Sequence, residues 1–190
     1  MDRTILISIL SIVVLFVPST ISAQSAEWGT YHNDEFNWSI KYPNDWIITE
    51  SGAPMFVRFY DGKNTGAMIV SIDETTDTDT WANKSEERWK KKYVEYTTID
   101  KKEITFVGER AIKITAQIRE RSDSTLYKCE IIFFTKNGKS YALWFYTLPS
   151  DYDMVDKKYF EPMRQSFVIQ EKTRPDILRR SVLIDSSLFK

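Results

Sequence analysis

Apolar and polar residues alternate with a period of two along much of the chain, which is the pattern of half-buried β-strands. The segments 36–42 (FNWSIKY) and 110–119 (RAIKITAQIR) show this alternation most cleanly. Shorter apolar runs bounded by turn residues predict further strands at 46–48, 55–60, 67–72 and 99–106. Residues 27–35, which precede the first of these strands, are expected to form an exposed lead-in.

The clearest hairpin lies between segments 126–135 and 140–148, which flank Asn137-Gly138. An Asn-Gly pair suits the positive φ angles of a tight two-residue turn. Both segments contain consecutive apolar residues and are therefore apolar on both faces, as strands covered from two sides are. We expect these two strands at the centre of the sheet, and the cleanly alternating ones nearer its edges or covering only one face.

A helix is predicted over residues 81–94. Its apolar stripe consists of Trp81, Ser85, Trp89 and Tyr93. Asp79 or Thr80 is expected to cap its first turn. The charged residues between the stripe positions, Glu86-Glu87-Arg88 and Lys90-Lys91-Lys92, predict a solvated face with paired charges; the alternative is a docking patch for an acidic partner.

A second helix is predicted over residues 151–166, with Ser150 and Asp153 forming a capping box. Pro162 lies inside this helix and is expected to kink or shorten it. Residues 167–169 then form either a last strand or the exit of the helix. These elements predict an α+β fold: an antiparallel sheet of about six or more strands, flanked by helices on both faces.

The first 25 residues predict export from the cytoplasm. Arg3 is followed by an apolar run from Ile5 to Val17, then by Pro18 and small residues, which is the layout of a signal peptide. The alternative is an uncleaved membrane anchor. Residues 26–170 are expected to form one domain, and residues 171–190 a C-terminal extension that is either docked or frayed.

Composition and charge limit the class of protein to which this chain can belong. Of the 190 residues, 42% are hydrophobic and 28% charged, as in a globular protein, and the net charge of −1 argues against nucleic-acid binding. Cys129 is the only cysteine, which excludes an intramolecular disulfide. An exported domain of this kind must therefore rely on its core, and aromatic residues make up 14% of the chain.

Three segments resemble the family of PsbP-like domains. The first is Phe36-x-x-x-Ile40-x-Tyr42-Pro43-x-x-Trp46, the second Tyr141-x-Leu143-x-Phe145, and the third Gln165-Ser166-Phe167. The resemblance spans roughly residues 30–170, about the length of a domain. It implies an α/β/α sandwich, with an antiparallel sheet between helices.

The resemblance also implies a role without catalysis. PsbP is an extrinsic subunit of photosystem II in the thylakoid lumen, where it helps retain calcium and chloride; related domains include a Ran-binding nuclear import factor and bacterial envelope lipoproteins. This chain lacks the long, Ser- and Arg-rich transit peptide of a chloroplast protein. It is therefore more similar to a prokaryotic extracytoplasmic relative than to a photosystem subunit.

Four acidic residues form the only candidate metal site in the sequence. Asp73, Glu74, Asp77 and Asp79 could supply oxygen ligands to calcium or manganese, although the spacing lacks the glycine and distal glutamate of an EF-hand. The alternative is a solvated loop that caps the following helix. His32 is the only histidine and is expected to be exposed, because zinc sites usually need several His or Cys ligands.

Most of the other candidate functional residues are expected to have structural roles. Cys129 is expected in the core, and the six tryptophans are expected to pack there, with any surplus forming a pocket or a partner-binding patch. Asn37 and Asn83 each begin a glycosylation sequon. No serine–histidine–aspartate arrangement, phosphate-binding loop or paired-cysteine motif is present.

The sequence thus supports a non-enzymatic extracytoplasmic accessory or binding protein that docks on a protein partner at the membrane or cell surface, with no required cofactor. A calcium- or manganese-binding module using residues 73–79 is the first alternative. A small-ligand carrier or hydrolase with an aromatic pocket is the second.

Overall fold

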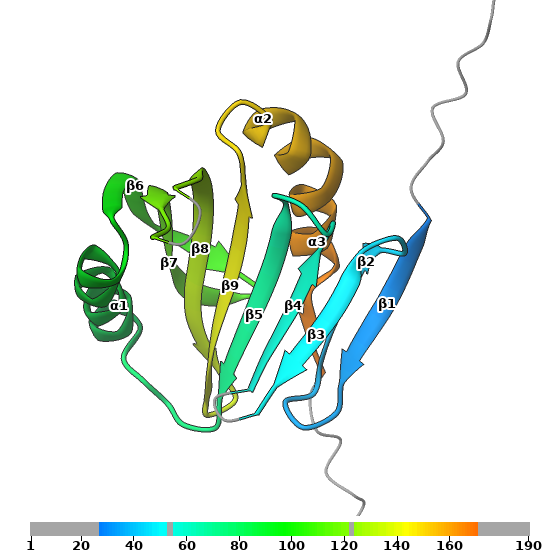
Figure 1. The fold of residues 1–190 in the computed structure, drawn as a ribbon. Helices are drawn as coiled ribbons and strands as arrows, with labels where there is room; N and C mark the ends of the chain where they lie inside the picture. Colours follow the sequence, from blue (N-terminus) through cyan, green and yellow to red (C-terminus); the bar gives the residue numbers. More distant parts are fainter. Residues whose placement is uncertain (1–26, 53–54, 122–123, 171–190) are drawn as a thin grey trace, which may run out of the picture.

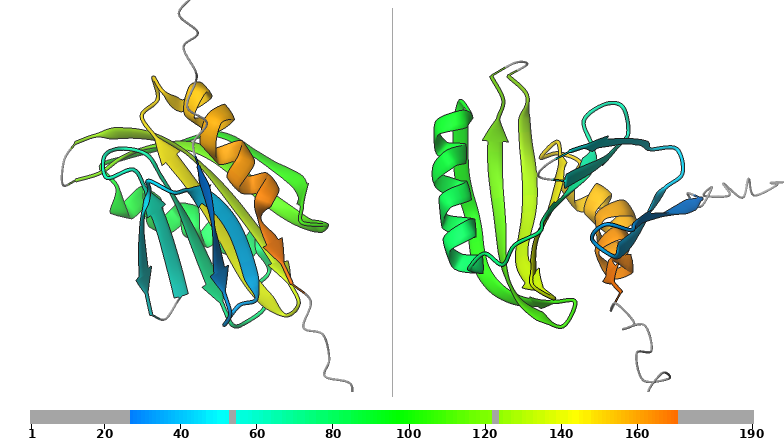
Figure 2. Two further views of the ribbon diagram at one scale, coloured as in Figure 1. Left: turned by 90° about the vertical axis from the view of Figure 1, so that its right-hand side faces the viewer. Right: turned by 90° about the horizontal axis from the view of Figure 1, so that it is seen from below.

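A computed structural model describes residues 27–170, apart from 53–54 and 122–123. The predicted export segment and the C-terminal extension therefore lie outside the described residues. A large twisted sheet forms the middle of the described fold, and helices pack on both of its faces (Figures 1 and 2). This arrangement confirms the predicted α+β class with helices on both sides.

The large sheet has seven strands in the order β3-β4-β5-β9-β8-β7-β6, and every neighbouring pair is antiparallel. The strands are β3 (Ile47–Ser51), β4 (Met55–Tyr60), β5 (Gly66–Ile72), β6 (Glu95–Phe106), β7 (Glu109–Arg119), β8 (Leu126–Lys136) and β9 (Lys139–Thr147). Five of the six neighbouring pairs are hairpins, and the pairing of β5 with β9 joins the two halves.

The hairpin strands β8 and β9 lie at the centre, as their two-sided apolar pattern predicts. Asn137 and Gly138 have φ angles of 53° and 78°, and Lys136 pairs with Lys139 across the turn. Positive φ at both turn residues matches the right-handed twist of the strands. Ile131, Ile132, Phe133 and Phe134 are all buried, because consecutive residues contact opposite cores.

A second, three-stranded sheet corrects two expectations. Its order is β1-β2-β10, with β1 at Trp28–Asn33, β2 at Trp38–Pro43 and β10 at Val168–Ile169. The segment 27–35 is therefore not an exposed lead-in, because most of it is a strand paired with β2. The alternating segment 36–42 does not border the large sheet either; it forms the middle strand of the small one. Of the two alternatives left open for residues 167–169, the structure has the last strand, β10.

Helix α1 (Thr78–Lys92) packs against β6, β7 and β8 on one face of the large sheet. It begins three residues earlier than the apolar stripe predicts, because Asp77 is the cap and accepts a hydrogen bond from the Thr80 amide at 2.8 Å. Asp79 and Thr80, the caps expected from the sequence, lie inside the first turn.

On the opposite face a single winding segment contains α2 (Tyr152–Val155), a π-helical turn η1 (Asp156–Phe160) and α3 (Glu161–Ser166). Pro162 does interrupt the regular helix, since the wide turn immediately precedes α3. The predicted capping box does not form: Asp151 is the cap residue without a side-chain cap bond, and the Ser150 hydroxyl donates to Asp151 instead. The segment contacts β9 and β2.

Each face of the large sheet carries its own core. One core contains Trp38, Phe59, Phe145 and Phe160, between the sheet, the small sheet and the α2–α3 segment. The other lies beneath α1 and contains Trp89 and Cys129, whose pKa is raised to about 12 by burial and which therefore stays a thiol. Among the described residues no helix has the length and apolar character required to cross a membrane.

Candidate functional site

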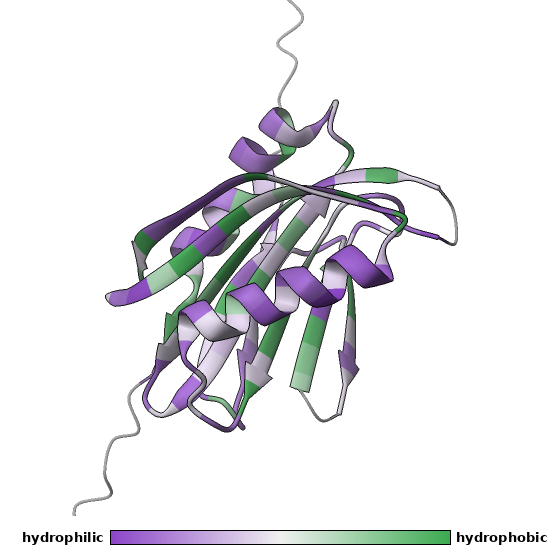
Figure 3. Cartoon of the chain, turned by 90° about the vertical axis from the view of Figure 1, so that its left-hand side faces the viewer, coloured by the Kyte–Doolittle hydropathy of each residue, from purple (hydrophilic) through white to green (hydrophobic). Residues whose placement is uncertain are grey.

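Helix α1 leaves part of its face of the sheet uncovered. It packs mainly against β6, β7 and β8 and meets β9 through the contact of Trp89 with Trp144, so part of this face lies beside the helix rather than beneath it (Figure 3). A groove of about 810 Å³ lies there, between α1 and the sheet. We call it the aromatic groove. Its size falls within the range of roughly 300–1,000 Å³ that is typical of small-ligand sites.

Two cross-strand rows of side chains form its floor. Arg58, Met68 and Trp144 are partners in neighbouring strands, and so are Phe56, Val70 and Ala142. The rows arise because alternate residues of each strand point to the same side of the sheet. Most of these side chains are only half-buried, and apolar ones among them, such as Met68 and Val70, leave surface open in the groove.

Aromatic rings form the wall towards α1. The Trp89 ring on α1 contacts the Trp144 ring at 4.6 Å between centroids, in an edge-to-face arrangement. Trp81 on α1 meets Phe133 of the sheet in the same way at 5.1 Å. These contacts fasten the helix to the sheet and supply a rigid apolar surface. They confirm that the tryptophans pack together, and the half-buried Trp81 remains available to a ligand.

The groove has a cationic rim, which we define as Arg58, Lys63, Arg88 and Lys92. Among the described residues none of these four forms an ion pair, whereas Arg110 and Lys139 elsewhere do. Arg58 is held in place: its Nε donates to the Tyr146 hydroxyl at 2.8 Å, and its guanidinium lies 4.4 Å from the centre of the Tyr60 ring. Burial raises the pKa of Tyr146, which therefore stays a neutral phenol.

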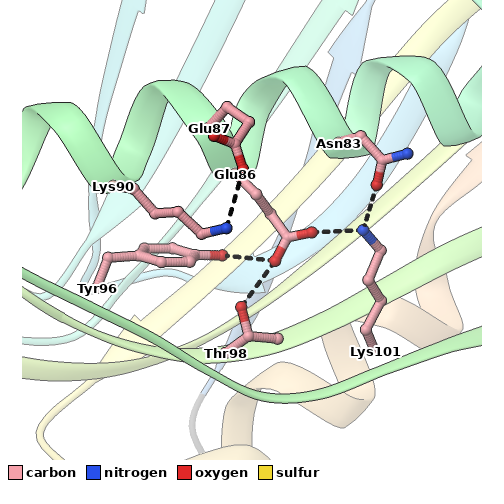
Figure 4. Close-up of polar contacts among 7 residues, drawn as sticks. All are labelled: Asn83, Glu86, Glu87, Lys90, Tyr96, Thr98 and Lys101. Carbon is pink, nitrogen blue, oxygen red and sulfur yellow. Dashed lines mark hydrogen bonds and ion pairs between the residues drawn. The ribbon is translucent and has the colours of Figure 1, made fainter.

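A polar cluster on α1 fixes the helix against β6 and corrects the predicted solvated face (Figure 4). Glu86 is buried, with 7% of its surface exposed. Its carboxylate accepts hydrogen bonds from the Lys101 ammonium, from the Thr98 hydroxyl at 2.7 Å and from Tyr96. Lys101 also donates to Asn83 at 2.6 Å. The paired charges expected from the sequence are therefore present only in part, at Glu87 and Lys90.

Replacement of Glu86 by glutamine should destabilise the protein in a pH-dependent way. Burial raises the pKa of Glu86, but the hydrogen bonds from Lys101 and Thr98 outweigh it and hold this pKa below its usual value. At neutral pH we expect Glu86→Gln to lower the free energy of unfolding by about 1–2 kcal/mol, a moderate figure because Lys101 is partly exposed. Urea unfolding at several pH values measures this.

The sign of the pH dependence follows from the lowered pKa. A carboxylate whose pKa is lowered by folding stabilises the fold at pH values above its pKa in the unfolded chain. This contribution is lost as the pH falls through its pKa in the folded protein. The difference between wild type and Glu86→Gln should therefore shrink below about pH 4.3, the ordinary glutamate pKa. A difference that stays constant across the acid range would contradict this role of Glu86.

A second groove, of about 820 Å³, lies on the opposite face, beside α3. We call it the charged groove. Glu130 on β8, of which 5% is exposed, pairs there with Lys113 at 2.8 Å and with Arg164 at 3.0 Å. Arg164 Nη1 also lies 2.8 Å from Asp156 of the π-helical turn. Among the described residues, Arg164 Nη1, Glu130 Oε1 and Asp156 Oδ1 lie at ion-pair distances, but their contacts do not have hydrogen-bond geometry.

The four acidic residues considered as metal ligands do not share a site, and three of them contact other protein groups. Asp73 pairs with Lys139 at 2.9 Å, Asp77 caps α1, and Asp79 forms two hydrogen bonds with Arg110. Glu74 is exposed. Within the part of the chain that the structure describes, no three metal-ligating side chains gather. Calcium or manganese binding stays a prediction.

The remaining candidates have these positions. His32 is exposed, on β1. Asn37 is half-buried in the turn before β2, with a φ of 53°, and its carbonyl accepts the Gln170 amide. Asn83 lies on α1, and its side chain is the acceptor for Lys101. Glycosylation at Asn37 and Asn83 stays a prediction.

Comparisons with known proteins bear on the fold. No family model matches the sequence, and no curated protein matches it either. Among solved structures, cyanobacterial PsbP (CyanoP) from Synechocystis sp. PCC 6803 superposes with a TM-score of 0.60 at 16% identity, over 78% of this chain and 96% of that one. The chain has a PsbP-like fold.

A protein from Bacteroides thetaiotaomicron also superposes on this PsbP-like fold, with a TM-score of 0.53 at 12% identity. The match covers 75% of this chain, which spans about half, 48%, of that longer one. Identities this low establish the likeness of fold alone. The three segments on which the sequence resemblance rests lie in or next to β2, β9 and α3.

Sequence reasoning missed the residues that give this PsbP-like fold its two grooves. A signal existed for Arg58 and Glu130, because each is a charged residue within an otherwise largely apolar strand. Such residues must find partners or line a cavity when the strand is buried. Lys63 and Arg88 carry no comparable signal, since an exposed loop and a helix surface are ordinary places for cations.

Proposed function

We propose that this chain is a non-enzymatic binding protein that acts outside the cytoplasm, at the membrane or cell surface, and that it binds through the aromatic groove. The observation that carries the proposal is the groove itself. A concave, mostly apolar site with a small number of polar groups is the usual make-up of a binding site. The predicted export segment at residues 1–25 supports the location.

The chemistry of the groove supports binding without catalysis. Its polar side chains are mainly guanidinium, ammonium and phenol groups. Burial raises the pKa of both Tyr93 and Tyr146. These two phenols therefore keep their protons near neutral pH, which suits hydrogen bonding to an anion better than removing a proton from a substrate.

Two forms of this function differ in what fills the groove. Docking on a protein partner was the first expectation from the sequence, and a small-ligand carrier with an aromatic pocket was an alternative. The carrier is favoured by a specific observation, the volume of about 810 Å³ between α1 and the sheet. A calcium- or manganese-binding module gains less support, because Asp73, Asp77 and Asp79 already have protein partners.

Site-specific crosslinking in the native organism tests the proposal. A photo-crosslinking amino acid at Val70, on the groove floor, should yield a defined adduct in intact cells. The matched control places the same group at Met154, which is 65% exposed on α2. We expect a discrete adduct from position 70 and none from position 154, with mass spectrometry identifying the class of molecule. Equal labelling from both positions would count against the groove.

A further inference from the structure

We infer that the aromatic groove takes an anionic amphiphile, with its apolar chain on the floor and a single phosphate or carboxylate group at the cationic rim. The inference rests on the proposed function, since it concerns the same groove, and it adds the chemical class of the ligand. Three features of the groove support it: the open apolar floor, the unpaired rim and the concave shape.

The floor suits an apolar chain. Met68 and Val70 lie side by side on β5 with part of their surface open, and the half-buried Trp81 flanks them from α1. Burying such side chains against a ligand removes apolar surface from water, which is favourable in proportion to the area covered.

The rim suits an anion. Its four cations face a single lining carboxylate, that of Glu120. Some exposed cations elsewhere have acidic partners, as in the contact of Arg110 with Asp79 and Glu103, whereas the four rim cations have none among the described residues. Cations without acidic partners along the edge of an apolar site raise the local potential and attract anions.

Arg58 is the best-placed member of the rim. Its Nε is bonded to Tyr146, and its guanidinium is stacked on Tyr60, so the side chain is held in one orientation. Among the described residues, the two terminal nitrogens of Arg58 form no hydrogen bond. A guanidinium with both terminal nitrogens free offers two parallel donors to a carboxylate or phosphate.

The shape favours a small amphiphile over a segment of a protein partner. A stable protein interface covers roughly 800 Å² on each partner. The observed site is instead a trough between one helix and five strands, β4, β5, β7, β8 and β9, with a volume in the small-ligand range. An acidic protein segment is the competing occupant, and the experiment below distinguishes the two.

The test compares three probes with the same twelve-carbon chain on the purified chain, below their micelle concentrations. Dodecyl phosphate is anionic, dodecyl maltoside neutral and dodecyltrimethylammonium cationic. Calorimetry and quenching of tryptophan fluorescence measure affinity. We expect dodecyl phosphate to bind at least about tenfold more tightly than either of the other probes, as several cation–anion contacts in partial solvent would give. Inorganic phosphate alone should not bind measurably, because it lacks the chain.

Two variants locate the binding. The triple variant Lys63→Gln, Arg88→Gln, Lys92→Gln should weaken dodecyl phosphate binding about tenfold and leave dodecyl maltoside unchanged. Its control removes the same number of cations outside the groove. The control substitutions are Lys84→Gln, Lys91→Gln and Lys157→Gln, and they should change neither affinity. Val70→Trp should fill the floor and weaken both probes, with circular dichroism verifying the fold of each variant.

The outcomes separate this inference from the proposed function. Equal affinity for the three head groups, or a rim variant that binds like its control, would overturn the anionic preference. Failure of every amphiphile to bind would overturn the inference altogether. In that case, a protein adduct from position 70 in the crosslinking experiment would leave the binding function of the groove intact and assign it to a protein segment.

Discussion

Arg164→Met is expected to lower the free energy of unfolding by about 3–5 kcal/mol. The substitution preserves most of the side-chain volume but removes the positive charge that lies between Glu130 and Asp156. Glu130 is 5% exposed, so its carboxylate would keep only Lys113 as an ionic partner in a place with little water. A buried charge that loses a partner is far more costly than an exposed one. Urea unfolding followed by fluorescence measures the loss.

Two controls separate charge from packing. Arg110→Met breaks two ion pairs, with Asp79 and Glu103, whose side chains are 49% and 61% exposed, and it should cost much less. The double variant Glu130→Gln, Arg164→Met removes both members of the buried pair and should recover part of the lost stability, since the buried carboxylate of Glu130 is gone and the Asp156 side chain that remains is 30% exposed. A double variant as unstable as Arg164→Met alone would show that packing of the arginine stem, not its charge, matters.

Trp38→Ala is expected to cost a similar amount, about 3–5 kcal/mol. Trp38 is 1% exposed and connects the small sheet to the large one. Its ring lies 5.3 Å from Tyr31 and 5.7 Å from Phe167, and its indole nitrogen donates to the buried Ser71 hydroxyl at 3.0 Å. Alanine would leave a cavity between β2, β5 and the end of α3, together with an unsatisfied hydroxyl.

Trp38→Phe is the informative partner of this variant. It keeps an aromatic ring in the core but loses the hydrogen bond to Ser71, so it should cost about 1–3 kcal/mol. Thermal unfolding of both variants, and of Ser71→Ala, which removes the acceptor alone, separates the contribution of the ring from that of the hydrogen bond. If Trp38→Phe were as damaging as Trp38→Ala, the hydrogen bond would outweigh the ring in joining the two sheets.

Much of the large sheet could be predicted because its signals are local. The Asn137-Gly138 turn fixes the pairing of β8 with β9, and the apolar character of both faces places these strands at the centre. Alternation in 110–119 predicts β7, which pairs with the outermost strand β6. In each case a few neighbouring residues carry the information, through backbone geometry at a turn or through the side-chain period of a strand.

The small sheet could not be predicted as a unit, because one of its three strands is distant in the sequence and another has a weak strand pattern. β10 pairs with β2 across more than a hundred residues of intervening chain. β1 has a weaker alternation of apolar and polar residues than β2. Its pairing with β2 is what makes a strand of most of residues 27–35, which the sequence predicts to be an exposed lead-in. The start of α1 was missed for a similar reason: Asp77 is one of several acidic residues that could cap a helix there, and the packed helix selects one of them.

The sequence by itself determined the class of the fold, the central hairpin, the positions of most strands and the aromatic nature of the core. It also carried the likeness to PsbP-like domains, which the superposition on CyanoP confirms at the level of the fold. The fold class, the strand positions and the aromatic core follow from composition and from periodicities of two and 3.6 residues, which are local properties of short segments.

Only the tertiary structure decided where the grooves lie and which charges line them. The cationic rim draws Arg58 from β4, Lys63 from the following loop, and Arg88 and Lys92 from α1, so no short window of sequence contains the site. Glu130 and Arg164 likewise meet only because α3 packs near β8. A groove is the surface that packed elements leave uncovered, and that surface is set by the relative placement of helix and sheet rather than by the preferences of any single segment.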